Sequence, residues 1–218
     1  MPIVIAVDGT AASGKGTLAK RLARHFGFAH LDSGSLYRLV ALGVVQSGGA
    51  PANEADALAA ARAIDTSRGN DPAIRTAEIG NAASIVSAFP AVRETLLQFQ
   101  RAFAKNPPGA VIDGRDIGTV VCPDATAKLF VDAKPQVRAH RRWLELQAAG
   151  HPREESAILA EIEARDARDR NRAVAPLKPA ADACLLDTSD LDIDRAFAAA
   201  LALVTPRVEN ALKARQGG

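Results

Sequence analysis

The sequence predicts an α/β fold in which helices cover both faces of a five-stranded parallel sheet. Short apolar, strand-like runs alternate along the chain with longer segments whose apolar residues have helical spacing. Hydrophobic residues make up 48% of the 218 residues, which is ample for the core of one domain. The first strand passes into the first helix through a glycine-rich turn. In folds of this kind, ligands bind at the carboxyl ends of the strands.

The first part of the chain supplies two strands and five helices. Residues 3–7 are apolar and mostly β-branched, as in a buried strand. Leu18, Leu22 and Phe26 recur every four residues, which is typical of the buried face of a helix. Pro90 suits the first turn of a helix. The remaining elements expected here are a strand at 29–31, helices at 33–46, 54–64, 74–87 and 90–104, and a polar turn at 65–72.

The second part continues the alternation and supplies three strands and three helices. Its apolar runs predict strands at 110–112, 128–131 and 183–186. The segments between and after them predict helices at 135–149, 154–170 and 192–215. Together with the first part, this gives the five parallel strands and right-handed crossovers of a three-layer fold.

The glycine-rich turn has the sequence of a P-loop, and the expected fold is therefore of the P-loop NTPase type. Its backbone N–H groups and the helix N-terminus form a cradle for anions, and the lysine can reach the β- and γ-phosphates of a nucleotide. The alternative is a turn with an exposed lysine, but the flanking strand and helix favour a nucleotide-phosphate site. The residues expected to bind ATP are Gly9, Thr10, Ala11, Ala12, Ser13, Gly14, Lys15, Gly16 and Thr17.

The residue after the P-loop lysine narrows the class of protein. Gly16 stands where many P-loop proteins have the Ser or Thr that meets Mg²⁺, and a hydroxyl comes one place later, at Thr17. We assign no direct metal ligand and expect Mg²⁺ to arrive with ATP, near Thr17. The G-K-G-T sequence resembles the loop of nucleoside monophosphate kinases. No later strand ends in an Asp followed by a hydrolytic Glu, which disfavours an ATPase.

Composition limits the compartment and the partners. No apolar run approaches the length of a membrane span, and Met1-Pro2 leads straight into the first strand without a signal sequence. Cys122 and Cys184 lie far apart without metal-ligand spacing, so a reducing cytoplasmic location is expected. The four histidines are scattered, and we expect no zinc site.

The net charge of +2 does not favour binding to nucleic acid, and without an exposed apolar stripe a monomer is expected. Of the 27 basic residues, 20 are Arg, whose planar guanidinium binds phosphate through two hydrogen bonds.

Four polar clusters follow the predicted strands, at 31–38, 112–119, 163–177 and 186–189. Each has a plain alternative: Ser33 as an N-cap, or 161–172 as a solvated helix face with i,i+4 ion pairs. Because all four share the sheet edge that bears the P-loop, we interpret them together as a binding site.

These clusters carry a family resemblance over nearly the whole chain. The sequence is similar to bacterial cytidylate kinases, with D-S-G-S-L-Y-R at 32–38, V-R-E-x-L at 92–96, G-R-D-I-G-T-V-V-x-P-D-A at 114–125, R-D-x-R-D-x-N-R-x-x-A-P-L at 165–177 and L-D-T-S at 186–189. The resemblance implies that ATP, with Mg²⁺, phosphorylates CMP or dCMP to CDP or dCDP, in pyrimidine nucleotide metabolism.

Residue roles follow from this resemblance. Ser33, Tyr37 and Arg38 would line the monophosphate pocket, and Arg38, Arg115 and Arg172 would bind the CMP phosphate. Ser84, Arg93 and Asp116 would read the cytosine, because a carboxylate accepts from its N4 amino group and repels the oxygen of uracil. Arg165 and Asp169 would hold the ribose. Catalysis would depend on Lys15, Arg38, Arg115 and Arg172. No general base is needed, because the attacking phosphate of CMP is mostly dianionic at neutral pH.

The resemblance also divides the single domain 1–218. The core would comprise about 1–62, 88–147 and 163–218, with a nucleoside monophosphate (NMP) binding insert at about 63–87 and a lid at about 148–162 that brings Arg153 to ATP. The insert is short, since 65–77 replaces a longer segment found in many bacterial cytidylate kinases, so the tightness of base discrimination stays open.

Two alternatives remain. The first is another small-molecule P-loop kinase, acting on UMP, AMP or shikimate, which Arg93, Asp116 and the Arg165/Asp169 pair disfavour. The second is a binding module or nucleic-acid-associated ATPase that uses the arginine run. Aromatic residues are only 4% of the chain, and the arginines alternate with aspartates, which disfavours that reading.

Overall fold

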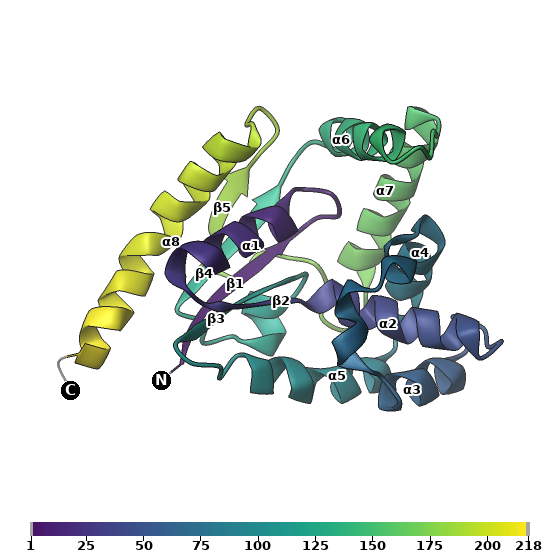
Figure 1. Cartoon of the computed structure of the whole chain (residues 1–218), viewed down its shortest axis with the longest axis horizontal. Coiled ribbons are helices and arrows are strands. Elements are labelled where there is room, and N and C mark those ends of the chain that lie inside the picture. The colour runs from purple at the N-terminus through teal and green to yellow at the C-terminus, as the bar shows by residue number, and fades with distance from the viewer. Residues whose placement is uncertain (1, 217–218) are drawn as a thin grey trace.

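A central parallel sheet organises the computed structural model, which describes residues 2–216; Met1, Gly217 and Gly218 of the predicted domain lie outside it. All neighbouring strands pair in parallel, in the order β2-β3-β1-β4-β5. The predicted α/β class, of the P-loop NTPase type with five parallel strands and helices on both faces, is confirmed (Figure 1). The strands are β1 (Ile3–Gly9), β2 (Ala29–Asp32), β3 (Gly109–Gly114), β4 (Ala127–Asp132) and β5 (Cys184–Asp187).

The helices lie close to their predicted positions. They are α1 (Lys15–Phe26), α2 (Ser33–Gln46), α3 (Glu54–Arg62), α4 (Ala77–Val86), α5 (Pro90–Phe103), α6 (Pro135–Ala148), α7 (Glu155–Asn171) and α8 (Ile193–Gln216). Between residues 2 and 216, no helix is both long and apolar enough to cross a membrane.

The central strand β1 is buried on both faces, and its side chains divide between two packing layers. Ile3, Ile5 and Val7 face one cluster, which contains residues of α1 and α8. Val4 and Ala6 face another, which contains residues of α5 and of the turn after β3. This alternation is the period of two expected of a strand. It explains why the strand reads as a continuous apolar run, as buried parallel strands do.

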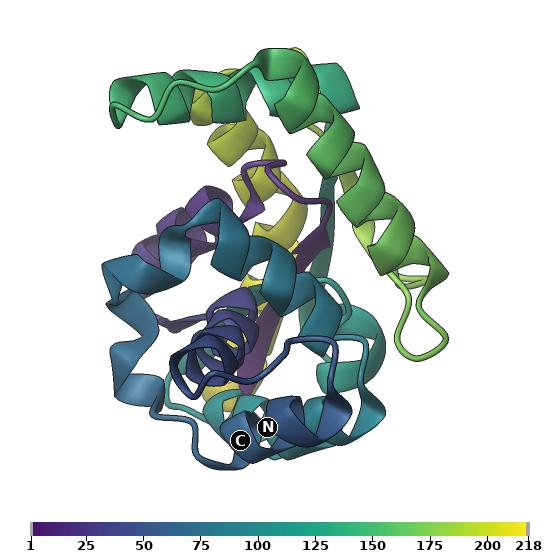
Figure 2. The same ribbon diagram turned by 90° about the vertical axis from the view of Figure 1, so that its right-hand side faces the viewer.

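Two further groups of helices stand beside the sheet. Helices α2, α3, α4 and α5 pack against one another through a separate hydrophobic cluster. The α6–α7 pair, called here the α6–α7 arm (135–171), packs on itself through a small cluster that includes Ala139, Ile158 and Ile162. Figure 2 shows the arm, in green, along the top and down the right-hand side of the molecule. The arm and the α2–α5 group thus flank the edge of the sheet to which the P-loop belongs.

Local structure differs from the prediction in three places. The predicted turn at 65–72 contains a 3-10 turn, η1 (Thr66–Asn70). The predicted helix 74–87 is divided into a 3-10 turn, η2 (Pro72–Arg75), and α4, because the hydroxyl of Thr76 accepts from the N–H of Ile79 at 3.2 Å and caps α4. A π-helical turn, η3 (Ile117–Val121), follows β3 and has no counterpart in the prediction.

The turn η3 forms because a residue far away in the chain holds its first N–H groups. The two carboxylate oxygens of Asp8, at the end of β1, accept hydrogen bonds of 2.7 Å from the N–H groups of Ile117 and Gly118. Burial raises the pKa of Asp8 to about 7, although both N–H groups favour its charged form. This contact attaches the segment after β3 to the start of the P-loop.

The P-loop begins where two strands leave no space for a side chain. A Cβ added to Gly9, which has φ +154°, would lie 2.0 Å from the carbonyl oxygen of Val131 on β4. A separation this short cannot be relieved by a rotamer change, because the obstructing atom belongs to the backbone of the neighbouring strand. The residue type at this position is therefore fixed by the sheet.

We predict that Gly9→Ala destabilises the protein by more than about 3 kcal/mol, within the range known for overpacking or strain in a core. Gly27→Ala is the matched control: Gly27 ends α1 with φ +66° and has no atom within 4 Å of the added Cβ, so about 1 kcal/mol is expected. Urea unfolding measures both. Equal midpoints for the two variants would show that β1 and β4 separate readily at this position.

Candidate active site

The P-loop connects β1 to α1, and its shape is held by a hydrogen bond to β4 and by another within the loop. The hydroxyl of Thr10 donates to Asp132 at 2.6 Å, and the hydroxyl of Ser13 donates to the carbonyl of Thr10 at 3.1 Å. Gly14 caps α1 in the left-handed conformation, with φ +84°. The loop thereby presents the N-terminus of α1, where backbone N–H groups are free to bind an anion.

Lys15 lies among charges of both signs. Burial lowers the pKa of its ammonium group to about 8, and the charge of Arg115 lowers it further, whereas Asp113 and Asp32 oppose the shift. Burial alone would raise the pKa of Asp32, but Lys15 and Arg75 bring it below its usual range. Burial and the neighbouring guanidinium thus outweigh the two carboxylates, so a further anion would stabilise the charged form of Lys15, as expected of a site for a polyanion.

A buried ion-pair cluster lies where the predicted cytosine-reading residues come together. Arg93 of α5 donates to Asp116, which follows β3, and both side chains are buried. A guanidinium nitrogen of Arg172, at the end of α7, lies 3.8 Å from the other carboxylate oxygen of Asp116. The guanidinium carbon of Arg93 lies 5.8 Å from the ring centroid of Tyr37, on α2. The structure therefore brings four predicted site residues, from four segments, into one cluster.

A second cluster joins β3 to α7. The Nε of Arg115 donates to Asp169 at 2.8 Å. Burial would raise the pKa of Asp169, but Arg115 and Arg165 lower it below its usual range. Burial also lowers the pKa of Arg165 to about 9, and the neighbouring charge of Arg115 adds to the effect. The Asp169–Arg115 pair and Arg165 bring the two predicted ribose-binding residues and one phosphate-binding residue together.

Each of the two clusters contains an arginine with a hydrogen-bond donor that has no acceptor among residues 2–216. The Nε atoms of Arg165 and Arg172 are buried, and neither has a hydrogen-bond partner within the part of the chain that the structure describes. Buried donors of charged groups are costly to leave unpaired. Phosphate oxygens are the acceptors that guanidinium groups match best. The two donors could therefore be satisfied by an anion.

Three other predicted residues have partners within the protein. Arg38 donates to the carbonyl of Ile74 at 2.7 Å, which joins α2 to η2. The hydroxyl of Ser33 donates to the carbonyl of Asp113 at 2.7 Å. The hydroxyl of Ser84 accepts from the Nε of Arg168 at 3.3 Å, a contact between α4 and α7. All three residues thus lie on elements that face the α6–α7 arm or the end of β3.

The plain alternatives for two clusters are wrong. The N-cap of α2 is Asp32, whose carboxylate accepts from the N–H of Ser35 at 3.2 Å, so Ser33 is not the cap. The arginine run is not merely a solvated face, because Asp166 and Asp169 of α7 are buried. One i,i+4 pair exists, between Arg170 and Asp166, and its atoms are 3.8 Å apart.

Arg153 lies apart from these clusters. It forms two hydrogen bonds with Glu161, of 3.0 and 2.5 Å, and lies in the loop between α6 and α7. That loop is at the outer end of the arm (Figure 1). The structure thus pairs Arg153 with α7 and does not bring it to the P-loop.

Sequence reasoning missed three buried charged residues near the site. Asp8 and Asp113 are the strand-ending carboxylates of β1 and β3, each directly before a glycine, and that placement was a usable signal. A carboxylate oxygen of Asp113 accepts from Nε2 of His30 at 2.9 Å, and the other lies near the start of α1, 3.6 Å from a Cβ built on Gly16. Arg138, on α6, is fully buried, and a single Arg between small and apolar neighbours gave no signal.

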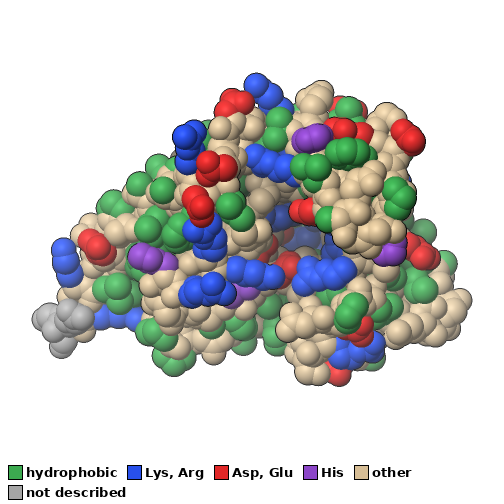
Figure 3. All heavy atoms as spheres, turned by 45° about the horizontal axis from the view of Figure 1, so that its top comes forward, with side chains coloured by type: hydrophobic (Ala, Val, Ile, Leu, Met, Phe, Trp, Pro, Cys, Tyr) green, Lys and Arg blue, Asp and Glu red, His purple; other side chains and the backbone are tan. Residues whose placement is uncertain are grey.

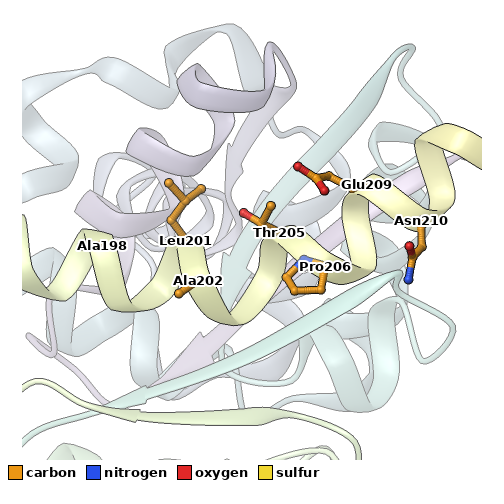
Figure 4. A pocket seen from close by; sticks show the side chains of 7 residues that line it. All are labelled: Ala198, Leu201, Ala202, Thr205, Pro206, Glu209 and Asn210. Carbon is orange, nitrogen blue, oxygen red and sulfur yellow. The ribbon is translucent and has the colours of Figure 1, made fainter.

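Basic side chains of the site are also visible on the molecular surface. Figure 3 shows Lys and Arg side chains gathered around the hollow near its centre, beside the α6–α7 arm. A different hollow, of about 580 Å³, runs along α8 and is lined by that helix alone, including Leu201, Pro206 and Glu209 (Figure 4). It has no cluster of charged groups comparable to the site at the sheet edge. The chemistry therefore points to the P-loop edge.

Comparisons with known proteins agree with this geometry. The family model described as cytidylate kinase matches residues 5–206. A cytidylate kinase of Afipia carboxidovorans is 58% identical over 202 residues, covering 93% of this chain and 97% of that protein. One of Rhodopseudomonas palustris is 57% identical over 202 residues, covering 93% and 95%. The fold is shared with an uncharacterized protein from Eubacterium ventriosum, with a TM-score of 0.55 at 16% identity, over 93% and 98% of the two chains. The chain belongs to the cytidylate kinase family.

Proposed function

We propose that this protein transfers the γ-phosphoryl group of ATP to CMP or dCMP, giving ADP and CDP or dCDP, in pyrimidine nucleotide metabolism. The observation that carries the proposal is the buried cluster of Arg93, Asp116 and Arg172, in which Asp116 follows β3, the strand beside the one that leads into the P-loop. A P-loop accounts for the nucleotide donor, and a carboxylate held between two arginines accounts for an acceptor base with an amino group.

The acceptor site is proposed to combine residues of four helices and the segment after β3. Asp116 would accept from the N4 amino group of cytosine, with Arg93 and Ser84 beside it. Arg165 and Asp169 would hold the ribose, and Ser33 and Tyr37 would line the phosphate pocket. The phosphate itself would meet Arg38, Arg115 and Arg172. The buried, unpartnered Nε atoms of Arg165 and Arg172 support this assignment.

Phosphoryl transfer in this site would depend on positioning and charge. Lys15, Arg38, Arg115 and Arg172 would neutralise the charge on the transferring group and reduce the repulsion between two polyanions. A phosphate oxygen of CMP is the nucleophile, and its second pKa of about 6 leaves it mostly unprotonated at neutral pH. The protein therefore has no need of a general base.

Mg²⁺ fits the residues on the donor side. Thr17 lies in the first turn of α1, and the Asp113 carboxylate lies beside the start of the same helix. A hydroxyl and carboxylate oxygens are the hard ligands that Mg²⁺ prefers, either directly or through water. Mg²⁺ bound with ATP would supply positive charge at the β- and γ-phosphates.

The proposal extends to the mobile parts and to the setting. Residues 63–87 would close on CMP, and 148–162 would act as the lid, with Arg153 released from Glu161 to contact ATP.

Two cysteines without a disulfide accord with a reducing, cytoplasmic location. We propose a monomer, which size-exclusion chromatography with light scattering would test.

A nucleotide panel tests the base-reading role. With ATP and Mg²⁺, we expect rapid ADP release with CMP and dCMP, little with UMP or AMP, and almost none without an acceptor. Asp116→Ala should lower the preference for CMP over UMP by about 10²-fold, because the amino group loses its acceptor. Asp194→Ala, which removes an Arg–Asp pair between α1 and α8, is the control and should leave the preference unchanged.

The panel has two informative failures. Equal ADP release with and without an acceptor would replace the kinase by a hydrolase. A preference for CMP that survives in Asp116→Ala would move base reading to another residue and leave the kinase activity standing.

The pH dependence of ADP binding tests the environment of Lys15. Its charged form binds phosphate, so affinity is fully present below the pKa of about 8 and is lost as the pH rises above it, by up to about tenfold per pH unit. Calorimetry between pH 7 and 9.5 should show this loss, with proton uptake on binding. Lys15→Met should bind weakly with a flat profile. The same slope in that variant would assign the titration to another group.

A further inference from the structure

The fully buried Arg138 connects three segments that sequence patterns do not link. It lies in the first turns of α6, and its exposed fraction is 0%. Its Nε donates to the carbonyl of Ala133 at 2.8 Å, one Nη to the carbonyl of Ala11 at 2.9 Å, and the other Nη to the carboxylate of Asp166 at 2.6 Å. One guanidinium thus joins the end of β4, the P-loop and α7.

The bond to Ala11 supports a strained turn of the P-loop. The next residue, Ala12, has φ +59°, a left-handed conformation that costs a residue other than glycine about 1–2 kcal/mol. Fixing the carbonyl of Ala11 fixes the peptide plane that enters this turn. The orientation of the N–H groups that follow, which face the donor phosphates, therefore depends on Arg138.

The bond to Asp166 anchors the helix that carries the proposed acceptor site. Asp166 lies directly after Arg165 and three residues before Asp169, so the three residues span only about 6 Å along the axis of α7. Asp169 is bound in turn to Arg115, after β3. The helix is therefore attached on one side to the P-loop and on the other to the acceptor loop.

A stabilising role alone does not account for the pair. A buried Arg–Asp pair contributes little more than a well-packed apolar pair, because removing both charges from water is costly. One carboxylate oxygen of Asp166 also has no hydrogen-bond partner between residues 2 and 216. What an apolar pair could not supply is the planar set of donors that meets three acceptors in fixed directions.

We propose that Arg138, together with Asp166, is a positioning element that sets the distance and angle between the two phosphate-binding halves of the site. The inference rests on the proposed kinase function. The base of the α6–α7 arm is then a fixed part of the site, and lid movement is confined to the outer part of the arm. Neither residue is among those proposed to bind the substrates, and the guanidinium of Arg138 is bound to three protein acceptors.

Arg138→Lys tests this directly, because lysine keeps the charge but cannot meet all three acceptors. The kcat of CMP phosphorylation should fall at least tenfold, with KM for ATP and for CMP within threefold, because each half-site stays intact while their alignment is lost. ADP release without acceptor, relative to CMP-dependent release, should rise at least tenfold, because water competes better with a misaligned acceptor.

Asp166→Asn, a nearly isosteric change, gives a second route if Arg138→Lys does not fold. It should shift kcat and the hydrolysis ratio in the same direction by about threefold or more. The double variant should lie within twofold of the more impaired single variant, as expected of residues that act as one unit. Additive losses would contradict a joint role.

Val208→Ala is the matched control for lost stability, because Val208 is fully buried in α8, in a cluster that contains no residue of the α6–α7 arm. It should lower the thermal midpoint and leave kcat and the hydrolysis ratio within twofold of the natural protein. If Arg138→Lys behaves like this control at a temperature where all variants are folded, Arg138 is merely structural and the proposal fails.

Hydrogen exchange separates this proposal from the kinase function itself. Without any nucleotide, Arg138→Lys and Asp166→Asn should exchange faster in residues 10–14 and 162–170 only, whereas Val208→Ala should affect α8. Unchanged exchange in those two segments would overturn the proposal whatever the activity. Faster exchange in a protein without CMP-dependent ADP release would overturn the proposed function and retain the structural coupling.

Discussion

The partial burial of cations that also repel one another, at one edge of the sheet, is the constraint on which the other features of the site depend. Burial, with the nearby charge of Arg115, lowers the pKa of Lys15 to about 8 and that of Arg165 to about 9. Such a group is costly without compensation. The carboxylates that compensate these groups come from different elements: Asp32 ends β2, Asp113 lies on β3, and Asp169 belongs to α7. The charges therefore hold the β3 segment and α7 in a common arrangement.

The same arrangement stores binding energy for polyanions. Hydrogen-bond donors that are already aligned and only partly satisfied lose little conformational entropy when a ligand binds. A bound phosphate also places a negative charge between cations that otherwise repel one another. The architecture makes this possible because the P-loop, the β3 segment and α2 all follow strands at one edge. The arm adds α7 from outside the sheet, held by buried ion pairs in place of a large apolar cluster.

Much of this could be predicted from the sequence, for physical reasons that differ between residues. The five strands were visible because buried parallel strands are continuous apolar runs, and the P-loop because its chemistry is local. The segments of Asp116 and Arg172 could be brought together from the sheet edge that they share, whereas the place of Arg93 and the role of each residue came from the family resemblance. The π-helical turn η3 and the buried Arg138 were not predictable, because each depends on partners more than a hundred residues away, Asp8 and Ala11. The split at Thr76 shows the usual difficulty of placing a cap within a helical pattern.

The contact of Asp8 with η3 bears on how this scaffold can be altered. Asp116, one of the three residues that would choose the nucleobase, stands in the segment after β3, which invites exchange of that segment for one from a relative with another preference. Its conformation, however, is imposed by a carboxylate on β1, not by its own sequence. A transplanted segment would bring its own side chains but take its shape from Asp8, the residue before the P-loop glycine, because the hydrogen bonds of that carboxylate are to main-chain N–H groups. The shape of the segment is therefore tied to the residue that precedes the donor site.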